Sequence, residues 1–189
     1  MQINNIKVSQ SFGKTPVMKC SVKSAETGKK EYATLYQMDP RNGGDYNEVK
    51  SSKNTRDIFF DFEQDYFNRS SLKQYYLLKN DKTQEVIGCA ETTKRMTGGV
   101  SGGRYLQIEE ISENQKYKNG IEPIFAYLVH FAKDVGQDAV VSISGENVIP
   151  NMHKARQVQI KTGEIITPYA NFDEILNHAE KRYNIEYTA

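Results

Sequence analysis

The chain has 189 residues and a mass of 21.6 kDa, which suits one domain with short extensions and excludes two sizeable catalytic lobes. Hydrophobic residues make up 38% and aromatic residues 11% of the chain, enough to form a core, so wholesale disorder is excluded. Twenty-five Lys and Arg against 24 Asp and Glu give a net charge of +1. That charge is too small for a dedicated nucleic-acid-binding protein.

The apolar segments are short, and none approaches the roughly 20 residues that a membrane helix needs. The first residues carry no apolar run of the kind that begins a secretory signal. We therefore expect a cytoplasmic protein with neither a membrane nor a nucleic acid as its partner. Cys20 and Cys89 are far apart in sequence and are expected to be buried thiols, and the spacing of Cys and His predicts no metal site.

The first third of the chain predicts a hairpin followed by a helix. Residues 1–15 show no sustained period and are expected to form a loosely held arm. Residues 17–22 and 31–36 alternate apolar and polar side chains around a Gly-containing turn, which is typical of two antiparallel strands. Residues 39–45 form a cluster of structure-breaking residues. A helix is expected after Asn54, with an apolar stripe predicted to face the core: Ile58, Phe59, Phe62, Tyr66 and Phe67.

The central part predicts a second hairpin and then a strand, a helix and a strand. Residues 75–78 and 85–92 are the expected hairpin strands. The next strand is expected at 105–111, followed by the strongest helix of the chain at 121–135. The continuous apolar run at 139–143 is typical of a buried strand, so a crossover onto a parallel neighbour is expected.

The tail adds two short predicted strands, near 158–160 and 164–167, and an amphipathic helix that begins near Phe172. Together the elements predict an α/β or α+β fold: a mixed, mainly antiparallel central sheet, splayed around residues 111–120, with helices on both faces. The predicted organisation is an arm over 1–15, a domain over 16–165 and a helical extension over 166–189 that packs on the domain.

The helix that follows Gly120 comes directly after a strand, so its first backbone N–H groups and the positive end of its dipole are expected to be unpaired and able to hold a phosphate. The order of elements, the run Tyr117–Glu122 and the later run 132–136 resemble the GCN5-related N-acetyltransferase superfamily. The resemblance covers roughly residues 73–165. The family's diphosphate motif is Gln or Arg, two residues, Gly, one residue, then Gly or Ala; Gly120 and Ile121 match it best.

The resemblance implies an acyl-CoA N-acyltransferase-like fold and acetyl-CoA as the cofactor. Backbone groups of Asn119, Gly120 and Ile121 would hold the diphosphate, and those of residues 111–113 would pair with the pantetheine arm. A later run, 155–164, is similar to another element of the family and is preceded by an asparagine near the family's position. The cofactor-binding residues implied by the resemblance are Ile111, Ser112, Glu113, Tyr117, Lys118, Asn119, Gly120, Ile121 and Asn151.

The implied reaction moves an acetyl group to a small-molecule or peptide amine by direct attack within a ternary complex. Such a reaction needs a general base, and the family places a carboxylate on the strand before the loop. Glu109, Glu110 and Glu113 are the available carboxylates, and Glu109 and Glu110 are the catalytic candidates. Neighbouring side chains of a regular strand point to opposite faces, so only one of the two is expected to face a given cleft.

Three residues depart from the family pattern and define an alternative. Glu122 puts a negative charge where the family has a small residue, Pro123 removes an amide donor, and Gln159 stands where many members place a proton-donating tyrosine. The alternative function is therefore a catalytically inactive interaction or regulatory module with the same fold. The acceptor and the oligomeric state do not follow from the sequence.

Overall fold

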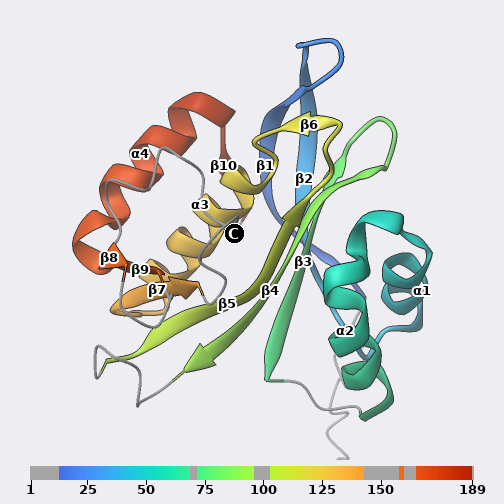
Figure 1. Cartoon of the computed structure of the whole chain (residues 1–189), viewed down its shortest axis with the longest axis horizontal. Helices are drawn as coiled ribbons and strands as arrows, with labels where there is room; N and C mark the ends of the chain where they lie inside the picture. The colour runs from blue at the N-terminus through green and yellow to red at the C-terminus, as the bar shows by residue number, and fades with distance from the viewer. Residues whose placement is uncertain (1–12, 69–71, 96–102, 143–157, 160–164, 189) are drawn as a thin grey trace, which may run out of the picture.

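A computed structural model describes residues 13–68, 72–95, 103–142, 158–159 and 165–188 (Figure 1). The strands within these residues are β1 (Thr15–Ser24), β2 (Lys30–Met38), β3 (Lys73–Asn80), β4 (Val86–Arg95), β5 (Tyr105–Glu113), β6 (Tyr117–Lys118), β7 (Ala139–Ser142), β8 (Val158–Gln159), β9 (Ile165–Pro168) and β10 (Glu186–Tyr187). The helices are α1 (Gly43–Ser51), α2 (Arg56–Asn68), α3 (Ile121–Asp134) and α4 (Phe172–Tyr183), with 3-10 turns at Lys53–Thr55 and Tyr169–Asn171.

The strands form one sheet in the order β10-β1-β2-β3-β4-β5-β7-β9-β8, and the short β6 pairs with β1. Every neighbouring pair is antiparallel except β5 and β7, which are parallel and are connected through α3. This arrangement confirms the predicted mixed, mainly antiparallel sheet. The two predicted hairpins are present as β1–β2 and β3–β4.

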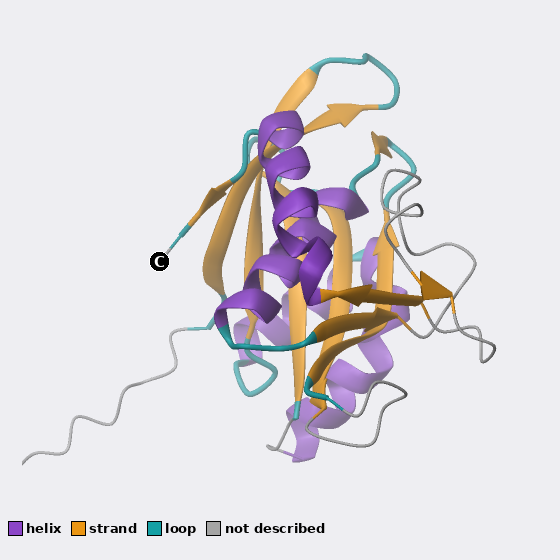
Figure 2. Ribbon diagram, turned by 90° about the vertical axis from the view of Figure 1, so that its left-hand side faces the viewer, coloured by secondary structure: helices purple, strands orange, loops and turns teal. Residues whose placement is uncertain are grey.

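The helices cover both faces of the sheet (Figure 2): α1 and α2 lie on one face, and α3 and α4 on the other. Strand alternation produces two cores, as β3 shows, because Tyr75 belongs to the α2 core and its neighbour Tyr76 to the α3 core. Both tyrosines are fully buried. The apolar stripe of α3 fills the larger core together with Phe172 and Ile175 of α4.

The parallel contact between β5 and β7 is short. It runs from Tyr105, which pairs with Ala139, to Ile108, which pairs with Ser142. The rest of β5, up to Glu113, pairs with β4 in the described part of the chain. The continuation of the chain after Ser142 lies outside the described residues, so the splay predicted around residues 111–120 stays a prediction.

Two local expectations are wrong. The cluster at residues 39–45 contains the start of α1, which begins at Gly43 because the Asn42 side chain accepts hydrogen bonds from the backbone N–H groups of Gly44 and Asp45. In α2, only Ile58 and Phe62 of the predicted stripe are buried, while Phe67 is 68% exposed.

Cys20 and Cys89 are both buried and unbridged, as predicted. Burial raises the pKa of each thiol to about 12. Among the described residues, no helix is long and apolar enough to cross a membrane.

Candidate active site

The first turn of α3 is closed by the protein itself. Glu113 Oε2, at the end of β5, accepts a hydrogen bond of 3.2 Å from the backbone N–H of Ile121. The N–H of Glu122 donates to the carbonyl oxygen of Asn119, and Pro123 has no N–H to offer. The expectation that the amide of Ile121 is unpaired is wrong, because a carboxylate at a helix N-terminus is favoured by the helix dipole and takes that place here.

Gly120 is close-packed on the face where a side chain would project. A Cβ atom at Gly120 would lie 2.9 Å from Cγ2 of Ile87 and 3.4 Å from Oε2 of Glu113. The bare face of this glycine therefore packs against β4 and the Glu113 carboxylate. With its Ile121 amide occupied and its glycine packed, the turn as it stands does not offer the set of free amides that the resemblance implies for the diphosphate of coenzyme A.

Glu122 lies in the interface between α3 and α4. Its side chain is 4% exposed; it accepts a hydrogen bond from the Tyr183 hydroxyl and lies 3.3 Å from a guanidinium nitrogen of Arg182. Burial raises the pKa of Glu122, although Tyr183 and Arg182 oppose that shift. The sequence interpretation set this charge beside a bound diphosphate, but its bonding partners are on α4.

A β-bulge in β5 determines where the two candidate bases lie. Glu110 pairs with Glu91 of β4 and Ile108 pairs with Thr92, so Glu109 is an extra residue in β5. Glu110 lies near Asp57 of α2, whose charge adds to burial in raising the pKa of Glu110. Glu109 accepts a hydrogen bond of 2.8 Å from Gln107.

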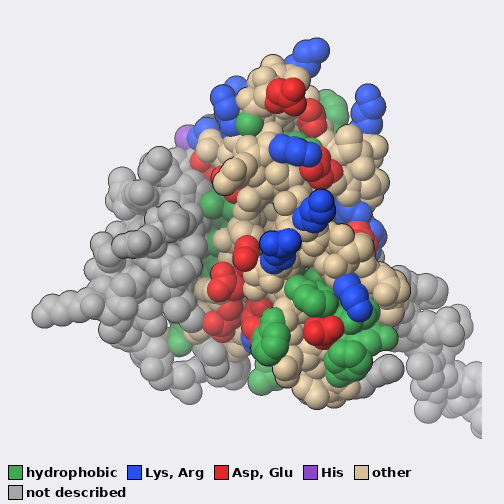
Figure 3. Space-filling view, turned by 45° about the vertical axis from the view of Figure 1, so that its right-hand side comes forward, with side chains coloured by type: hydrophobic (Ala, Val, Ile, Leu, Met, Phe, Trp, Pro, Cys, Tyr) green, Lys and Arg blue, Asp and Glu red, His purple; other side chains and the backbone are tan. Residues whose placement is uncertain are grey.

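Both candidate bases therefore belong to the face that α2 covers. Ile108 is in the α3 core, so its neighbour Gln107 faces α2, and Glu109 follows Gln107. The expectation that only one of Glu109 and Glu110 faces a given cleft is wrong, because the bulge interrupts the alternation. Figure 3 shows acidic side chains gathered beside α2 on this face.

Glu91 is the residue that sequence reasoning missed. It is completely buried in β4, and burial raises its pKa to about 7, although a hydrogen bond from Lys73 opposes the shift. Lys73 Nζ lies 2.5 Å from Glu91 Oε1 and 2.5 Å from Asp61 Oδ2 of α2. Burial alone would lower the pKa of Lys73, but these two hydrogen bonds outweigh it and raise that pKa. The sequence signal was a carboxylate directly after the apolar run of residues 86–90.

Two polar atoms on this face have no hydrogen-bond partner in the described part of the chain. They are Glu91 Oε2 and Thr93 Oγ1, and both are inaccessible to solvent. Thr93 follows Glu91 by two positions in β4, so both side chains are on the α2 face. We define Glu91, Thr93, Glu109, Glu110 and Asp61 as the acidic face.

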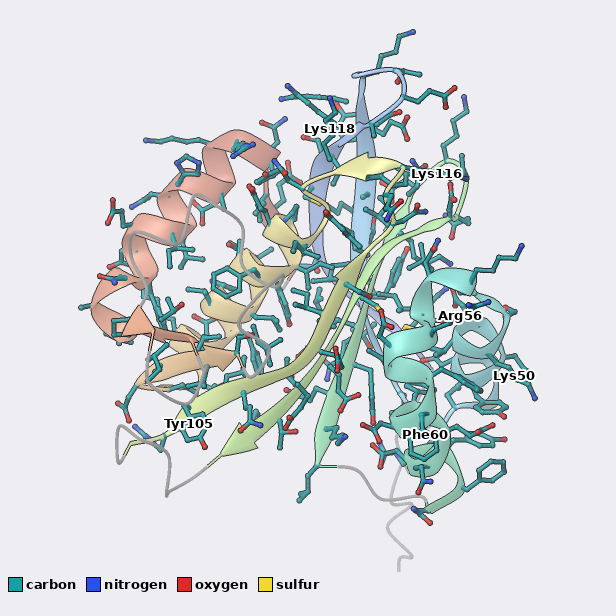
Figure 4. The ribbon with its side chains drawn as sticks, in the orientation of Figure 1. Lys50, Arg56, Phe60, Tyr105, Lys116 and Lys118 are labelled. Carbon is teal, nitrogen blue, oxygen red and sulfur yellow. The ribbon has the colours of Figure 1, made fainter. Side chains whose placement is uncertain are left out.

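The other predicted residues are divided between the two faces of the sheet. Ile111 is buried in the α3 core, whereas Ser112 Oγ lies 3.2 Å from the Cys89 sulfur in the α2 core. Tyr117 is buried and its hydroxyl accepts a hydrogen bond from Asn80. Lys118 and Asn119 are exposed; Figure 4 shows Lys118 near β6, at the opposite end of β5 from Tyr105. Asn151 lies outside the described residues.

No protein-family model matches the sequence, and no curated protein matches it. Solved structures are similar in fold. The AtaTR complex bound with AcCoA has a TM-score of 0.53 at 8% identity and covers 76% of this chain and 97% of its own. Spermidine N-acetyltransferase SpeG from Vibrio cholerae has a TM-score of 0.51 at 11% identity, covering 74% and 95%. The NatC complex bound to Gag peptide and CoA has a TM-score of 0.53 at 13% identity, covering 72% and 98%.

At identities this low, the likeness between these structures and the chain concerns the fold alone. The sheet order and the parallel β5–α3–β7 unit of this chain support the same conclusion. The chain is a divergent protein with the GCN5-related N-acetyltransferase fold.

Proposed function

We propose that the chain transfers an acyl group to a cationic amine that binds at the acidic face, with Glu91 as the general base. The proposal rests on the burial, the unpartnered oxygen and the raised pKa of Glu91. This carboxylate is fully buried, its Oε2 has no partner among the described residues, and its pKa is raised to about 7. A general base works best when its pKa is close to the working pH, since it is then both available and basic enough.

The unpartnered atoms support an amine as the ligand. Leaving a buried acceptor without a hydrogen bond costs about 1–3 kcal/mol, so such atoms often mark a place that a ligand or water fills. Glu91 Oε2 is an acceptor, the Thr93 hydroxyl can accept as well as donate, and an ammonium group carries only donors. Asp61, Glu109 and Glu110 add negative charge around them, while Lys73 neutralises part of it.

The chemistry at this face is a proton transfer followed by attack. Glu91 takes a proton from the ammonium group, and the lone pair that is freed on nitrogen attacks an acyl carbonyl carbon. The tetrahedral adduct then collapses to the amide: the bond between the carbonyl carbon and the donor's leaving group breaks, and the leaving group departs with that electron pair and takes the second proton that the nitrogen loses. Acetyl-CoA, the donor that the resemblance implies, would supply that carbonyl as a thioester. The Glu113 carboxylate occupies the Ile121 amide at the α3 turn, so the observations that support this proposal concern the acceptor half of the reaction.

The α3 turn supports a second function, a module that uses this fold without binding coenzyme A. The supporting observation is the Glu113 carboxylate on the Ile121 amide, which occupies a donor that a diphosphate would need. The close packing of Gly120 against Ile87 also supports a module that does not bind coenzyme A at this turn.

Acetyl transfer measured by mass spectrometry separates the two functions. Wild-type protein is incubated with acetyl-CoA and, in turn, spermidine, free lysine or a peptide with a free N-terminus. The proposal predicts an acetylated amine, and a loss of about 10²–10⁴-fold in rate for Glu91→Gln. The control Glu26→Gln removes a carboxylate from an exposed turn and should retain the wild-type rate. No acetylated product from any amine, together with no thermal shift in millimolar acetyl-CoA, would favour the second function.

A further inference from the structure

A pocket on the other side of the α3 turn is separate from the acidic face. It encloses about 370 Å³ between β1, β2, β6 and the end of α4. Four cationic side chains line it, and its lining contains no carboxylate: Lys23, Lys30, Lys118 and Arg182. Asn119 and the buried Tyr183 complete its wall on the side of the turn. A volume of this size is in the range of small-molecule sites.

The three lysines form a row across three strands. Lys23 of β1 is the direct cross-strand partner of Lys30 in β2 and also of Lys118 in β6. Like charges directly opposite each other destabilise a sheet. In the described part of the chain, no carboxylate forms an ion pair with any of the three lysines. The fold therefore holds an uncompensated row of positive charge against a pocket.

The fourth cation is held in place. A guanidinium nitrogen of Arg182 lies 3.3 Å from the Glu122 carboxylate, and the same carboxylate accepts a hydrogen bond from the Tyr183 hydroxyl. Glu122 balances the positive charge of Arg182. The three lysines then leave a net charge of about +3 in the pocket for a ligand to neutralise. One phosphate group carries at most two negative charges near pH 7 and does not balance three.

We propose that this pocket binds a compound with at least two linked phosphate groups. Lysine ammonium groups act as point charges on phosphate oxygens, and a guanidinium fork can bind two of them. A diphosphate can extend along the Lys30–Lys23–Lys118 row, so that one ligand relieves both like-charge pairs. A nucleotide and a coenzyme both contain this chemistry. The site does not depend on the proposed acyl transfer, because it shares no residue with the acidic face.

Calorimetric titration of the whole chain tests the site. Inorganic pyrophosphate, ADP and coenzyme A are titrated in turn at low salt, with orthophosphate for comparison. We expect saturable binding of pyrophosphate with one site per chain, at least tenfold tighter than orthophosphate and weakened by added salt. Absence of saturable binding for pyrophosphate, ADP and coenzyme A alike overturns the proposal.

One charge reversal and one charge neutralisation locate the binding. Lys23→Glu should weaken pyrophosphate binding at least tenfold, and Lys118→Gln, from a different strand, should weaken it severalfold. Both positions are exposed, so folding is retained and is checked by circular dichroism. The matched control Lys82→Glu makes the same charge change in the exposed β3–β4 turn and should leave binding within twofold. Equal weakening by Lys82→Glu contradicts a local site.

The coenzyme A titration identifies the source of the phosphate. If Lys23→Glu weakens pyrophosphate and coenzyme A together, the pocket is one that a coenzyme can use. If it weakens pyrophosphate and ADP alone, the ligand is a free phosphate compound. Both results support the pocket, and neither depends on acetyl transfer being observed.

Discussion

The Tyr183 hydroxyl donates a hydrogen bond to the Glu122 carboxylate, and this contact connects the last turn of α4 to the first turn of α3 across 61 residues. Both side chains are buried, and Arg182 lies beside them. The contact places the C-terminal helix against the same turn that Glu113 caps from β5. The beginning of α3 is therefore held from two sides.

We predict that breaking this contact destabilises the protein. Glu122→Gln removes the charge from a buried hydrogen bond and should lower the free energy of unfolding by about 1–3 kcal/mol, and Tyr183→Phe should lower it by a similar amount. Because the two residues share one contact, the double variant should lose less than the sum of the single variants. Urea denaturation measures all three, with Tyr169→Phe at an exposed position as the control. Strict additivity would show that the contact contributes nothing.

Removing the carboxylate from the α3 turn should open it to a diphosphate. Glu113→Ala frees the Ile121 amide and removes a negative charge, so acetyl-CoA should raise the melting temperature of this variant more than that of the wild type. Glu113→Gln keeps an oxygen that can accept the amide while removing the charge, and should give an intermediate response. Thermal unfolding with increasing acetyl-CoA measures this. An identical response of the wild type and Glu113→Ala would show that the carboxylate does not compete with the coenzyme.

Glu91 should make stability fall as the pH rises from about 4.5 to 7. Its pKa is near 4.5 in the unfolded chain and is raised to about 7 in the folded protein by burial, so within this window the folded state binds the proton more tightly. Below this window Glu91 is protonated in both the folded and the unfolded state. Above it Glu91 is ionised in both states, and the loss of stability is complete. Glu91→Gln stays neutral, and its stability relative to the wild type should therefore increase between pH 5 and pH 8. Denaturation curves at both pH values test this, and a constant difference would contradict the raised pKa.

Gly88 should be intolerant of any side chain. A Cβ atom there would lie 2.8 Å from the backbone oxygen of Ser112 and 3.0 Å from Ile124. Because the carbonyl belongs to the paired strand β5, Gly88→Ala has to push β4 and β5 apart and should cost about 1–3 kcal/mol of stability. The control is Gly43→Ala at the start of α1, where the nearest atom would be 3.9 Å away. That variant should be neutral or slightly stabilising, and equal losses at both sites would refute the steric explanation.

The row of lysines should reduce the stability of the ligand-free protein. Lys23→Glu replaces two repulsive cross-strand pairs by two attractive ones, and should stabilise the fold by about 0.5–1.5 kcal/mol at low salt. The gain should shrink in 1 M salt because the charges are exposed. Chemical denaturation at the two salt concentrations measures it, with Lys82→Glu as the control for net charge. A loss of stability at low salt would contradict the predicted repulsion.

Much of the fold could be predicted because it depends on local patterns. Strand alternation predicted both hairpins, and the apolar stripe from Ile121 to Val135 predicted α3 almost to the residue. The start of α1 could not be predicted in this way. Gly43 and Gly44 have the composition of a loop, and the helix begins there because the Asn42 side chain satisfies its first amides.

The site was harder to predict because it depends on contacts between distant residues. The bulge at Glu109 is defined by how β5 pairs with β4. The alternation of side chains along β5 alone does not reveal that pairing. Glu91 becomes a candidate base through Lys73 and through burial, and neither follows from the strand's own sequence. The cap that Glu113 places on Ile121 likewise requires the chain to turn back over eight residues.

The pairing of β10 with β1 has a consequence for synthesis. Glu186 and Tyr187 hydrogen-bond with Lys19 and Met18, so one edge of the sheet is completed by residues that the ribosome adds some 170 positions later. Until those residues have left the exit tunnel, β1 presents an open edge on that side, and such edges promote association between nascent chains. This edge of the sheet is therefore completed long after β1 has been synthesised, and a chain truncated shortly before Glu186 is expected to be prone to aggregate.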